Sequence, residues 1–229
     1  MKIIGIHQPN YLPWMGYFYK ILKSDIFVIL DNVDYQSGNA NSITNRCRIK
    51  GPNGIVILTA PVKHNTDYKW INQQYIDYSR NWQMKHKRAV ENYYRKSPWF
   101  SQYYPQLEQI WDSKFDRLSE LNFGFIKLVC QFLDIQTPLL EASSLPPQKG
   151  NKSDRIIDIC IQLKADIYLS GNGARKYNDI DSFKKNKIEL VYTGFKPVEY
   201  PQQYDNFIPG LSILDALFNI GPDVKQLIN

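Results

Sequence analysis

The segment IIGIHQPNYLPWMGYFYKILKSDIFVILD (Ile3–Asp31) decides the fold. Within and around it, Lys2–His7 is apolar between polar residues and predicts a short buried strand. Two prolines exclude regular structure from Gln8–Pro13, so a loop follows. Trp14–Lys23 then has apolar residues at helical spacing, and Asp25–Asp31 has the β-branched and aromatic residues of a strand. This order predicts a right-handed βαβ unit with parallel strands.

A second α/β unit is predicted towards the other end of the chain. Ser153–Lys164 has the periodicity of a helix, and Asp166–Ser170 has the composition of a strand. A short helix over Ile180–Lys187, a strand over Ile188–Tyr192 and a final helix over Leu211–Asn219 follow. Such units at both ends favour one α/β fold with a doubly wound, mostly parallel, Rossmann-like sheet.

The middle of the chain is predicted to be helical. Helices are expected over Trp82–Lys96, near Tyr104–Trp111 and over Phe115–Leu133, the last with a continuous apolar stripe. We therefore expect one α/β domain over residues 1–229, with a helical insertion at residues 80–135.

Composition narrows the class of protein. The 229 residues are 43% hydrophobic and 22% charged, which excludes a disordered or fibrous chain. The longest clean apolar run, Ile26–Leu30, is too short to span a membrane, and no secretory signal is visible. The three cysteines are scattered and predict no disulfide framework: Cys47, Cys130 and Cys160. We expect a reduced, cytoplasmic protein.

The net charge of +6 and the 16 tyrosines each permit two interpretations. They fit a well-solvated surface and an ordinary aromatic core. They also fit an anionic partner, either a phosphorylated small molecule or RNA, because aromatic rings stack on bases and sugars.

Polar residues gather where the first predicted strand ends. Ligands of open α/β sheets bind outside the carboxyl ends of strands, and helix N-termini favour anions. His7 is therefore a candidate catalytic residue, whereas His64 and His86 are expected to be exposed. The candidate substrate-binding residues after it are Gln8, Asn10, Tyr11, Trp14 and Tyr17. The alternative is a hydrogen-bonded buried histidine in a loop that the prolines merely shape.

Asp31 is the second candidate catalytic residue, because parallel strands would bring it close to His7. It could orient the histidine, act as a base or, with Asp34, hold a divalent ion. Asn32 and Gln36, in the long polar stretch Asn32–Asn45, are candidate substrate-binding residues. A capped, solvated loop is the alternative.

Two further segments carry features of phosphate sites. Alternation along a hairpin strand places Arg46, Arg48 and Lys50 on one face, with Asn45 beside them, although a solvated face is the commoner outcome. The glycine-rich turn after the strand Asp166–Ser170 lets the backbone approach an anion. Its candidate substrate-binding residues are Ser170, Gly171, Asn172, Gly173 and Tyr177. No metalloprotease, serine-hydrolase or P-loop motif is present, and we predict no metal site.

Five motifs in this order resemble the WbqC-like protein family. They are IHQPNYLPWMGYFYKI (Ile6–Ile21), SDIFVILDNVDY (Ser24–Tyr35), NRCRIK (Asn45–Lys50), YLSGNGARKY (Tyr168–Tyr177) and YPQQYDNFIPGLSILDALFNIG (Tyr200–Gly221). The resemblance covers nearly the whole chain. It implies a role in the biosynthesis of O-antigen and related bacterial surface polysaccharides, with transfer of glycine or another acyl group to an amino sugar. It supplies no catalytic residues.

At the level of fold, the order of elements also looks like the nucleotidyltransferase and pantothenate synthetase group, whose members form adenylates from ATP. The HxGH motif of that group is absent, since Gly16-Tyr17 stands where Gly-His would be. This likeness is an analogy of fold and identifies no site.

The leading hypothesis is a transferase that acylates the amine of a nucleotide-linked amino sugar. His7 would be the general base, Asp31 would orient it, and Arg46 and Lys50 with Gly171–Gly173 would hold phosphates. The acyl donor stays open between glycine with ATP and Mg²⁺, an aminoacyl-tRNA and a thioester. The alternatives are a non-catalytic nucleotide-sugar or glycan-binding protein, an ATP-dependent amide ligase and an RNA-binding protein. Neither DNA nor a membrane is expected as a partner.

Overall fold

The computed structural model describes residues 1–36, 42–64, 67–204 and 206–229, so part of the polar stretch Asn32–Asn45 lies outside the described residues. The strands are β1 (Ile3–His7), β2 (Ile26–Ile29), β3 (Arg46–Gly51), β4 (Gly54–Thr59), β5 (Leu139–Glu141), β6 (Ile167–Ser170) and β7 (Glu189–Tyr192). The α-helices are α1 (Met15–Leu22), α2 (Trp82–Tyr94), α3 (Phe100–Asp112), α4 (Leu118–Phe132), α5 (Ser153–Gln162), α6 (Ile180–Lys185), α7 (Ile213–Ile220) and α8 (Val224–Leu227). Short 3₁₀ helices include η1 (Ile71–Gln73), η3 (Ala142–Ser144) and η4 (Asn172–Lys176).

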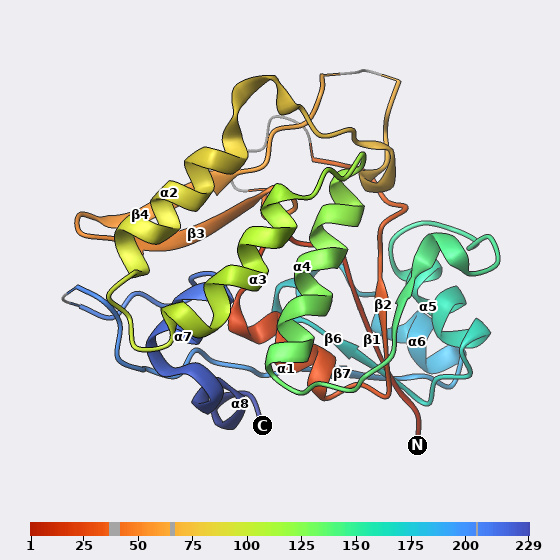
Figure 1. Cartoon of the computed structure of the whole chain (residues 1–229). Helices are drawn as coiled ribbons and strands as arrows, with labels where there is room; N and C mark the ends of the chain where they lie inside the picture. The colour runs from red at the N-terminus through yellow and green to blue at the C-terminus, as the bar shows by residue number, and fades with distance from the viewer. Residues whose placement is uncertain (37–41, 65–66, 205) are drawn as a thin grey trace.

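Five parallel strands form the main sheet in the order β5-β2-β1-β6-β7. Figure 1 labels β2, β1, β6 and β7 of this sheet. β1 lies in the centre and pairs with β2 on one side and β6 on the other. The chain adds β2 and β5 on the first side, then crosses over to add β6 and β7 on the second. The order therefore reverses between β1 and β6, which is where doubly wound sheets bind ligands. The predicted parallel α/β fold is confirmed.

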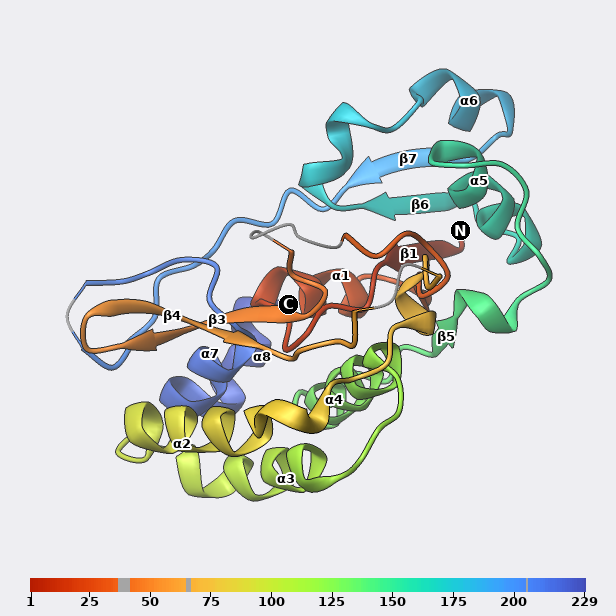
Figure 2. The same cartoon turned by 90° about the horizontal axis from the view of Figure 1, so that it is seen from above.

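Helices cover both faces of this sheet. Ile4, Ile6 and Val28 point into a core that they share with α5 and α6. Phe27 and Ile29, which alternate with Val28 along β2, point into the larger core on the other face, formed with α1, α4 and α7. Figure 2, seen from above, places α6 on one side of the strands and α3 and α4 on the other.

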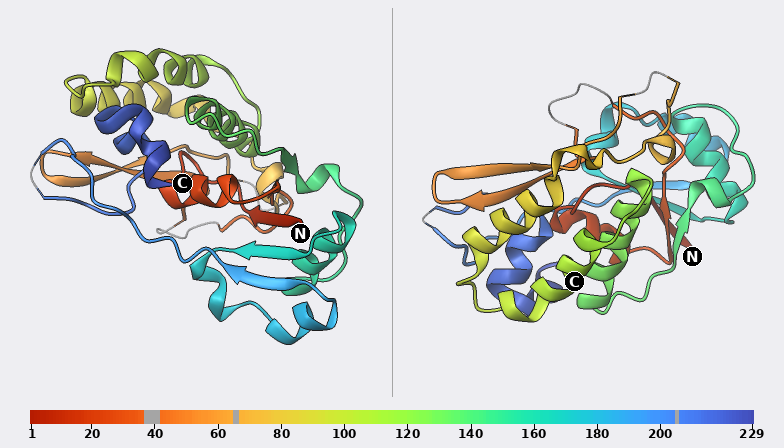
Figure 3. Two further views of the ribbon diagram at one scale, coloured as in Figure 1. Left: turned by 90° about the horizontal axis from the view of Figure 1, so that it is seen from below. Right: turned by 45° about the horizontal axis from the view of Figure 1, so that its top comes forward.

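Helices α2, α3 and α4 occupy the segment that the sequence marks as a helical insertion, residues 80–135. The predicted hairpin is also present, as β3 paired antiparallel with β4 outside the main sheet (Figure 3). Element bounds differ from the predicted ones by a few residues at each end. β5 was not predicted, because three residues are too few for a periodic pattern. The division into one domain with an insertion stays a prediction.

A buried polar cluster fastens the C-terminal segment to the hairpin. The ammonium group of Lys50 is buried and donates to the carbonyl oxygens of Tyr204 (3.2 Å) and Asn206 (2.6 Å). The Tyr94 hydroxyl accepts from the Lys50 backbone N–H (2.8 Å) and donates to Asp215 (2.8 Å). Lys50 therefore does not belong to a cationic face that could bind phosphate, as the sequence predicted, because its ammonium group is hydrogen-bonded to carbonyl groups of the protein itself.

The first testable prediction concerns this cluster. In Tyr94→Phe, the Lys50 N–H loses its acceptor and the Asp215 carboxylate loses a donor, both inside the protein. We expect the free energy of unfolding to fall by about 1–3 kcal/mol, measured by urea denaturation. The control is Tyr177→Phe, at a residue that is 72% exposed, and it should leave stability unchanged. Equal denaturation midpoints for Tyr94→Phe and wild type would contradict the assignment.

Candidate functional site

The loop Gln8–Pro13, between β1 and α1, is held by a residue far away in the sequence. Buried Asn122 of α4 donates to the carbonyl oxygens of Pro9 (2.9 Å) and Thr44 (2.7 Å). Leu12 within the loop has a φ of 43°, a left-handed conformation that is strained for a residue with a side chain. Such strain persists where surrounding contacts impose it, so the loop is preorganised rather than free to adapt. The sequence did not indicate a role for Asn122.

Trp14 lies at the end of this loop, and its side chain folds back over the first turn of α1. A Cβ at Gly16 would collide with the Trp14 ring, so a glycine is required at that position. The Phe195 ring packs edge-on against Trp14 at 5.5 Å. Trp14 is therefore fixed from both sides and forms a rigid wall.

His7 ends β1 at the point where the strand order reverses. Its Nδ1 lies 3.1 Å from the Gln8 carbonyl oxygen, and the Tyr17 ring lies edge-on at 5.0 Å. A carbonyl oxygen only accepts, so Nδ1 carries the proton and Nε2 keeps its lone pair. Burial, together with the charge of Lys20, lowers the pKa of His7 to about 4. At neutral pH the imidazole is uncharged and can accept a proton at Nε2.

Lys20 of α1 is a buried cation next to this histidine. Its Nζ donates to the Ile6 carbonyl oxygen (2.5 Å) and lies 5.9 Å and 5.6 Å from the ring centres of Phe27 and Tyr168. Burial lowers the pKa of its ammonium group to about 7. Helical spacing alone gave no sign of this, because a lysine in an amphipathic helix is usually exposed.

The glycine-rich turn after β6 lies beside His7. The register pairs Gly5 with Leu169, so His7 and Gly171 each stand two residues beyond that pair. A Cβ at Gly171 or Gly173 would meet nothing within 4 Å, so the backbone there faces open space. We call His7, Gln8 and Ser170–Gly173 the switch-point cluster.

The outer residues of this cluster are held by the chain itself. Buried Ser170 accepts from Asn178 (3.0 Å), and Asn172 accepts from the Gly194 N–H (3.1 Å). Tyr17 donates to the Gln8 carbonyl oxygen (3.1 Å). Predicted residues from two distant motifs are therefore brought together at one end of the sheet.

A cavity of about 500 Å³ adjoins the other end of the loop Gln8–Pro13. This volume is in the usual range of small-molecule sites. Its wall comes from the loop, from the hairpin and from the C-terminal segment: Asn10–Trp14, Ser42, Ile43, Arg46–Arg48, Ile57, Gly210 and Ser212. Four predicted substrate-binding residues are among them: Asn10, Tyr11, Trp14 and Arg46. None of the described residues that line the pocket is acidic. We call this cavity the loop–hairpin pocket.

Two buried polar atoms of the pocket wall make no hydrogen bond with the described residues. They are Oδ1 of Asn10, a residue that is 2% exposed, and Oγ of Ser42. Both atoms are inaccessible to solvent, so they lie behind the surface of the pocket that a ligand would touch. Arg48, at the exposed side, donates to the Gly210 carbonyl oxygen (3.1 Å), which closes the pocket between hairpin and C-terminal segment.

Behind the pocket, the Tyr11 hydroxyl is fixed by two partners. It accepts from Trp111 Nε1 (2.8 Å) and donates to His86 Nδ1 (2.9 Å). Burial lowers the pKa of His86 to about 4, so the imidazole is uncharged at neutral pH and one of its ring nitrogens can accept a hydrogen bond. The expectation that His86 is exposed is wrong, since the side chain is buried against Tyr11 and Trp82. The residues next to His86 in the sequence are polar, so the sequence did not indicate that His86 lies on the buried face of α2.

Asp31 is hydrogen-bonded to groups other than His7. Its carboxylate accepts from the Ser143 N–H (2.9 Å), from Ser143 Oγ (2.6 Å) and from Asn72 Nδ2 (3.1 Å). In the described part of the chain it makes no hydrogen bond with His7. Asp31 therefore ties the end of β2 to η1 and η3, and a catalytic role gains no support from these contacts.

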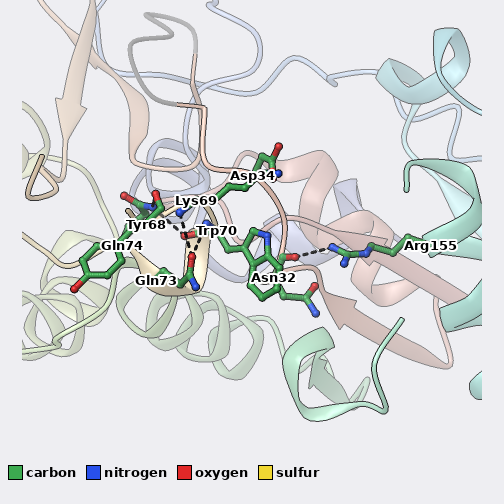
Figure 4. A network of polar contacts seen from close by, with 8 residues as sticks. All are labelled: Asn32, Asp34, Tyr68, Lys69, Trp70, Gln73, Gln74 and Arg155. Atoms are coloured by element: carbon green, nitrogen blue, oxygen red, sulfur yellow. Dashed lines mark hydrogen bonds and ion pairs between the residues drawn. The ribbon is translucent and has the colours of Figure 1, made fainter. Parts of the chain in front are cut away.

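Asn32 belongs to a neighbouring network rather than to the pocket (Figure 4). Its carbonyl oxygen accepts from Arg155 Nη1 (2.6 Å), and its Nδ2 donates to Gln148 (2.7 Å). Asp34 pairs with Lys69 at 3.5 Å in the same view. The carboxylates considered for a divalent ion are thus each engaged by different groups of the protein.

The remaining predicted residues lie outside both parts of the site. Asn45 is buried and donates to the Ala60 carbonyl oxygen (3.1 Å), which supports the hairpin. Gln36 is exposed, and Tyr177 is 72% exposed. Among the described residues, no helix has the length and apolar character needed to cross a membrane.

The second prediction tests the effect of Lys20 on His7. Between pH 7 and the ordinary lysine value of 10.5, folded protein binds fewer protons at Lys20 than unfolded protein, so wild-type stability rises with pH in that window. In Lys20→Met we expect urea denaturation at several pH values to show no such rise in stability. We also expect NMR titration to give a higher pKa for His7 than in the wild type.

The matched control is Lys23→Met, which changes an exposed lysine at the end of the same helix. It should follow the wild-type curves. A Lys20→Met variant that keeps both the pH dependence and the His7 pKa of the wild type would refute the coupling.

Comparisons with known proteins agree with the five motifs. The family model of the WbqC-like protein family matches residues 8–226. An uncharacterized protein of Mycobacterium tuberculosis, Rv1507c, is 33% identical over 233 positions, covering 100% of this chain and 98% of that protein. No solved structure matches the chain. The likeness of its fold to the nucleotidyltransferase group therefore stays a prediction. On the family match and the full-length relative, this chain belongs to the WbqC-like protein family.

Proposed function

We propose that the protein transfers an acyl group, glycyl or similar, to the amine of a nucleotide-linked amino sugar. The observation that carries this proposal is the state of His7: an uncharged imidazole, with Nε2 free to accept, at the point of the sheet where ligands of such folds bind. Acyl transfer to an amine needs a base at the attacking nitrogen. Membership of the WbqC-like family supports a place in surface polysaccharide biosynthesis.

The phosphates of the nucleotide sugar would lie against the open backbone of Gly171–Gly173. Backbone N–H groups of such turns bind anions without a dedicated side chain. This arrangement would hold the sugar amine near His7. Arg46, which was predicted to hold phosphates of the nucleotide sugar, lines the loop–hairpin pocket instead.

In the reaction, the sugar nitrogen attacks the acyl carbonyl carbon, and the new C–N bond replaces the bond to the leaving group. The nitrogen gives its proton to His7 Nε2, and His7 returns the proton to the leaving group. The negative charge of bound phosphates opposes the effect of Lys20 and raises the pKa of His7 from about 4. Substrate binding would therefore make the imidazole a stronger base when it is needed.

The third prediction is that His7→Gln reduces the rate of amide formation by about 100-fold or more. The protein is incubated with UDP- or dTDP-linked amino sugars and, in turn, glycine with ATP and Mg²⁺, an aminoacyl-tRNA and an acyl thioester. Mass spectrometry detects the amide. The control is His64→Gln, which changes an exposed histidine and should keep the wild-type rate.

Two results would overturn the proposal in different ways. A wild-type rate for His7→Gln would remove His7 from the mechanism. Binding of a nucleotide sugar without amide formation from any donor would instead make the protein a non-catalytic binding protein.

A further inference from the structure

The loop–hairpin pocket is a cavity of about 500 Å³ whose ligand the reaction above does not identify. It is lined chiefly by apolar groups of Leu12, Pro13, Trp14, Ile43 and Ile57. A free amino acid or an inorganic phosphate would leave such a wall unused. The lining therefore suits a ligand with a long apolar stretch.

The polar groups of the pocket are ordered by depth. Arg48 is exposed and marks the mouth, whereas Asn10 and Ser42 are buried in the wall. A matching ligand has an anion at its outer end and apolar groups further in. Among the described residues, none that lines the pocket is acidic and would repel that anion.

Two isoleucines at the mouth extend the apolar wall into solvent. Ile43 is 51% exposed and Ile57 is 58% exposed, and Ile57 stands directly opposite Arg48 in the hairpin. Exposed apolar side chains beside a cation indicate that the ligand extends past the mouth and carries its anionic group there. The mouth is thus both apolar and cationic.

The inner end of the pocket is close to the proposed base. Asn10 is three residues from His7, so their Cα atoms are at most about 11 Å apart even if the loop were fully extended. A donor that enters at Arg48 with its acyl group towards Asn10 would point that group along the loop that leads to His7. The two parts of the site are suited to two substrates.

We propose that the loop–hairpin pocket holds the acyl donor, and that the donor is a thioester of 4′-phosphopantetheine. The phosphate binds at Arg48, and the methyl and methylene groups of the arm lie along Trp14 and Ile57. This inference rests on the proposed acyl transfer and names its donor. The arm can come from coenzyme A or from a carrier protein, which share this chemistry.

The reaction with this donor needs no further reactant. The sugar nitrogen attacks the thioester carbon, the C–N bond forms and the C–S bond breaks. His7 takes the proton from nitrogen and passes it to the departing thiolate. The products are the N-acylated nucleotide sugar and the free thiol, so all atoms and electrons are accounted for.

The fourth prediction uses two variants on one strand. Ile57→Glu places a negative charge in the mouth beside Arg48, whereas Ile55→Glu changes a residue of the same strand and face that is 47% exposed and does not line the pocket. With S-acetyl-4′-phosphopantetheine as the probe, calorimetry should show at least a ten-fold loss of affinity for Ile57→Glu. Ile55→Glu should stay within two-fold of wild type.

A second comparison isolates the phosphate. Arg48→Gln should weaken binding of S-acetyl-4′-phosphopantetheine at least ten-fold, yet change binding of S-acetylpantetheine, which lacks the phosphate, by less than two-fold. Acetyl-CoA serves as the third probe. If acetyl-CoA binds more tightly than S-acetyl-4′-phosphopantetheine, and loses affinity in the same Ile57 and Arg48 variants, coenzyme A is the source of the arm. If the two probes bind with equal affinity, the source is a carrier protein.

Several results would overturn the inference. One is an equal loss of probe affinity in Ile57→Glu and Ile55→Glu. Another is an equal loss of affinity for both pantetheine probes in Arg48→Gln. A third is displacement of the probe from the pocket by UDP. Amide formation from an aminoacyl-tRNA but not from a thioester would refute the donor while leaving the transferase intact. Probe binding in the pocket without amide from any donor would instead refute the transferase.

Discussion

The parallel hydrogen bonding of β1 to both of its neighbours is the constraint on which the rest of the structure depends. Because β1 is central and the strand order reverses beside it, its carboxyl end borders both halves of the sheet. His7 takes that position as the last residue of the strand, and Gly171 follows β6 at the same level. Both faces of the sheet are covered by helices, so the strand ends are where backbone and polar side chains can meet a ligand.

The loop after β1 connects the switch-point cluster to the loop–hairpin pocket. Its conformation is imposed from outside, by Asn122 and by the packing that leaves Leu12 in a left-handed conformation. The same short loop joins His7 to Asn10, with little freedom to change the distance between them. A rigid connection of this kind suits a reaction that must hold two substrates in one orientation.

Electrostatics favour an uncharged base and anionic ligands. Lys20 is buried against the carbonyl group of Ile6 with aromatic rings around it, and His7 makes no hydrogen bond to a carboxylate among the described residues. The desolvation of Lys20 costs folding free energy, which its contacts with a carbonyl oxygen and two rings only partly offset. Within the described part of the chain, the wall of the pocket likewise has cations and no acid. The pocket therefore offers positive charge to a phosphorylated substrate.

The sequence by itself determined the elements and the ends of β1 and β6, because hydrophobic periodicity, prolines and glycines are local signals. From these ends, His7 and Gly171–Gly173 could be selected as site residues. Only the tertiary structure decided which polar side chains serve the fold: Asp31 binds Ser143, more than a hundred residues away, and Lys50 binds carbonyl groups of the C-terminal segment. It also decided the wall of the pocket, to which three distant segments contribute. The physical reason is that a side chain's partners are set by packing between elements, whereas spacing along the chain sets only the face on which it stands.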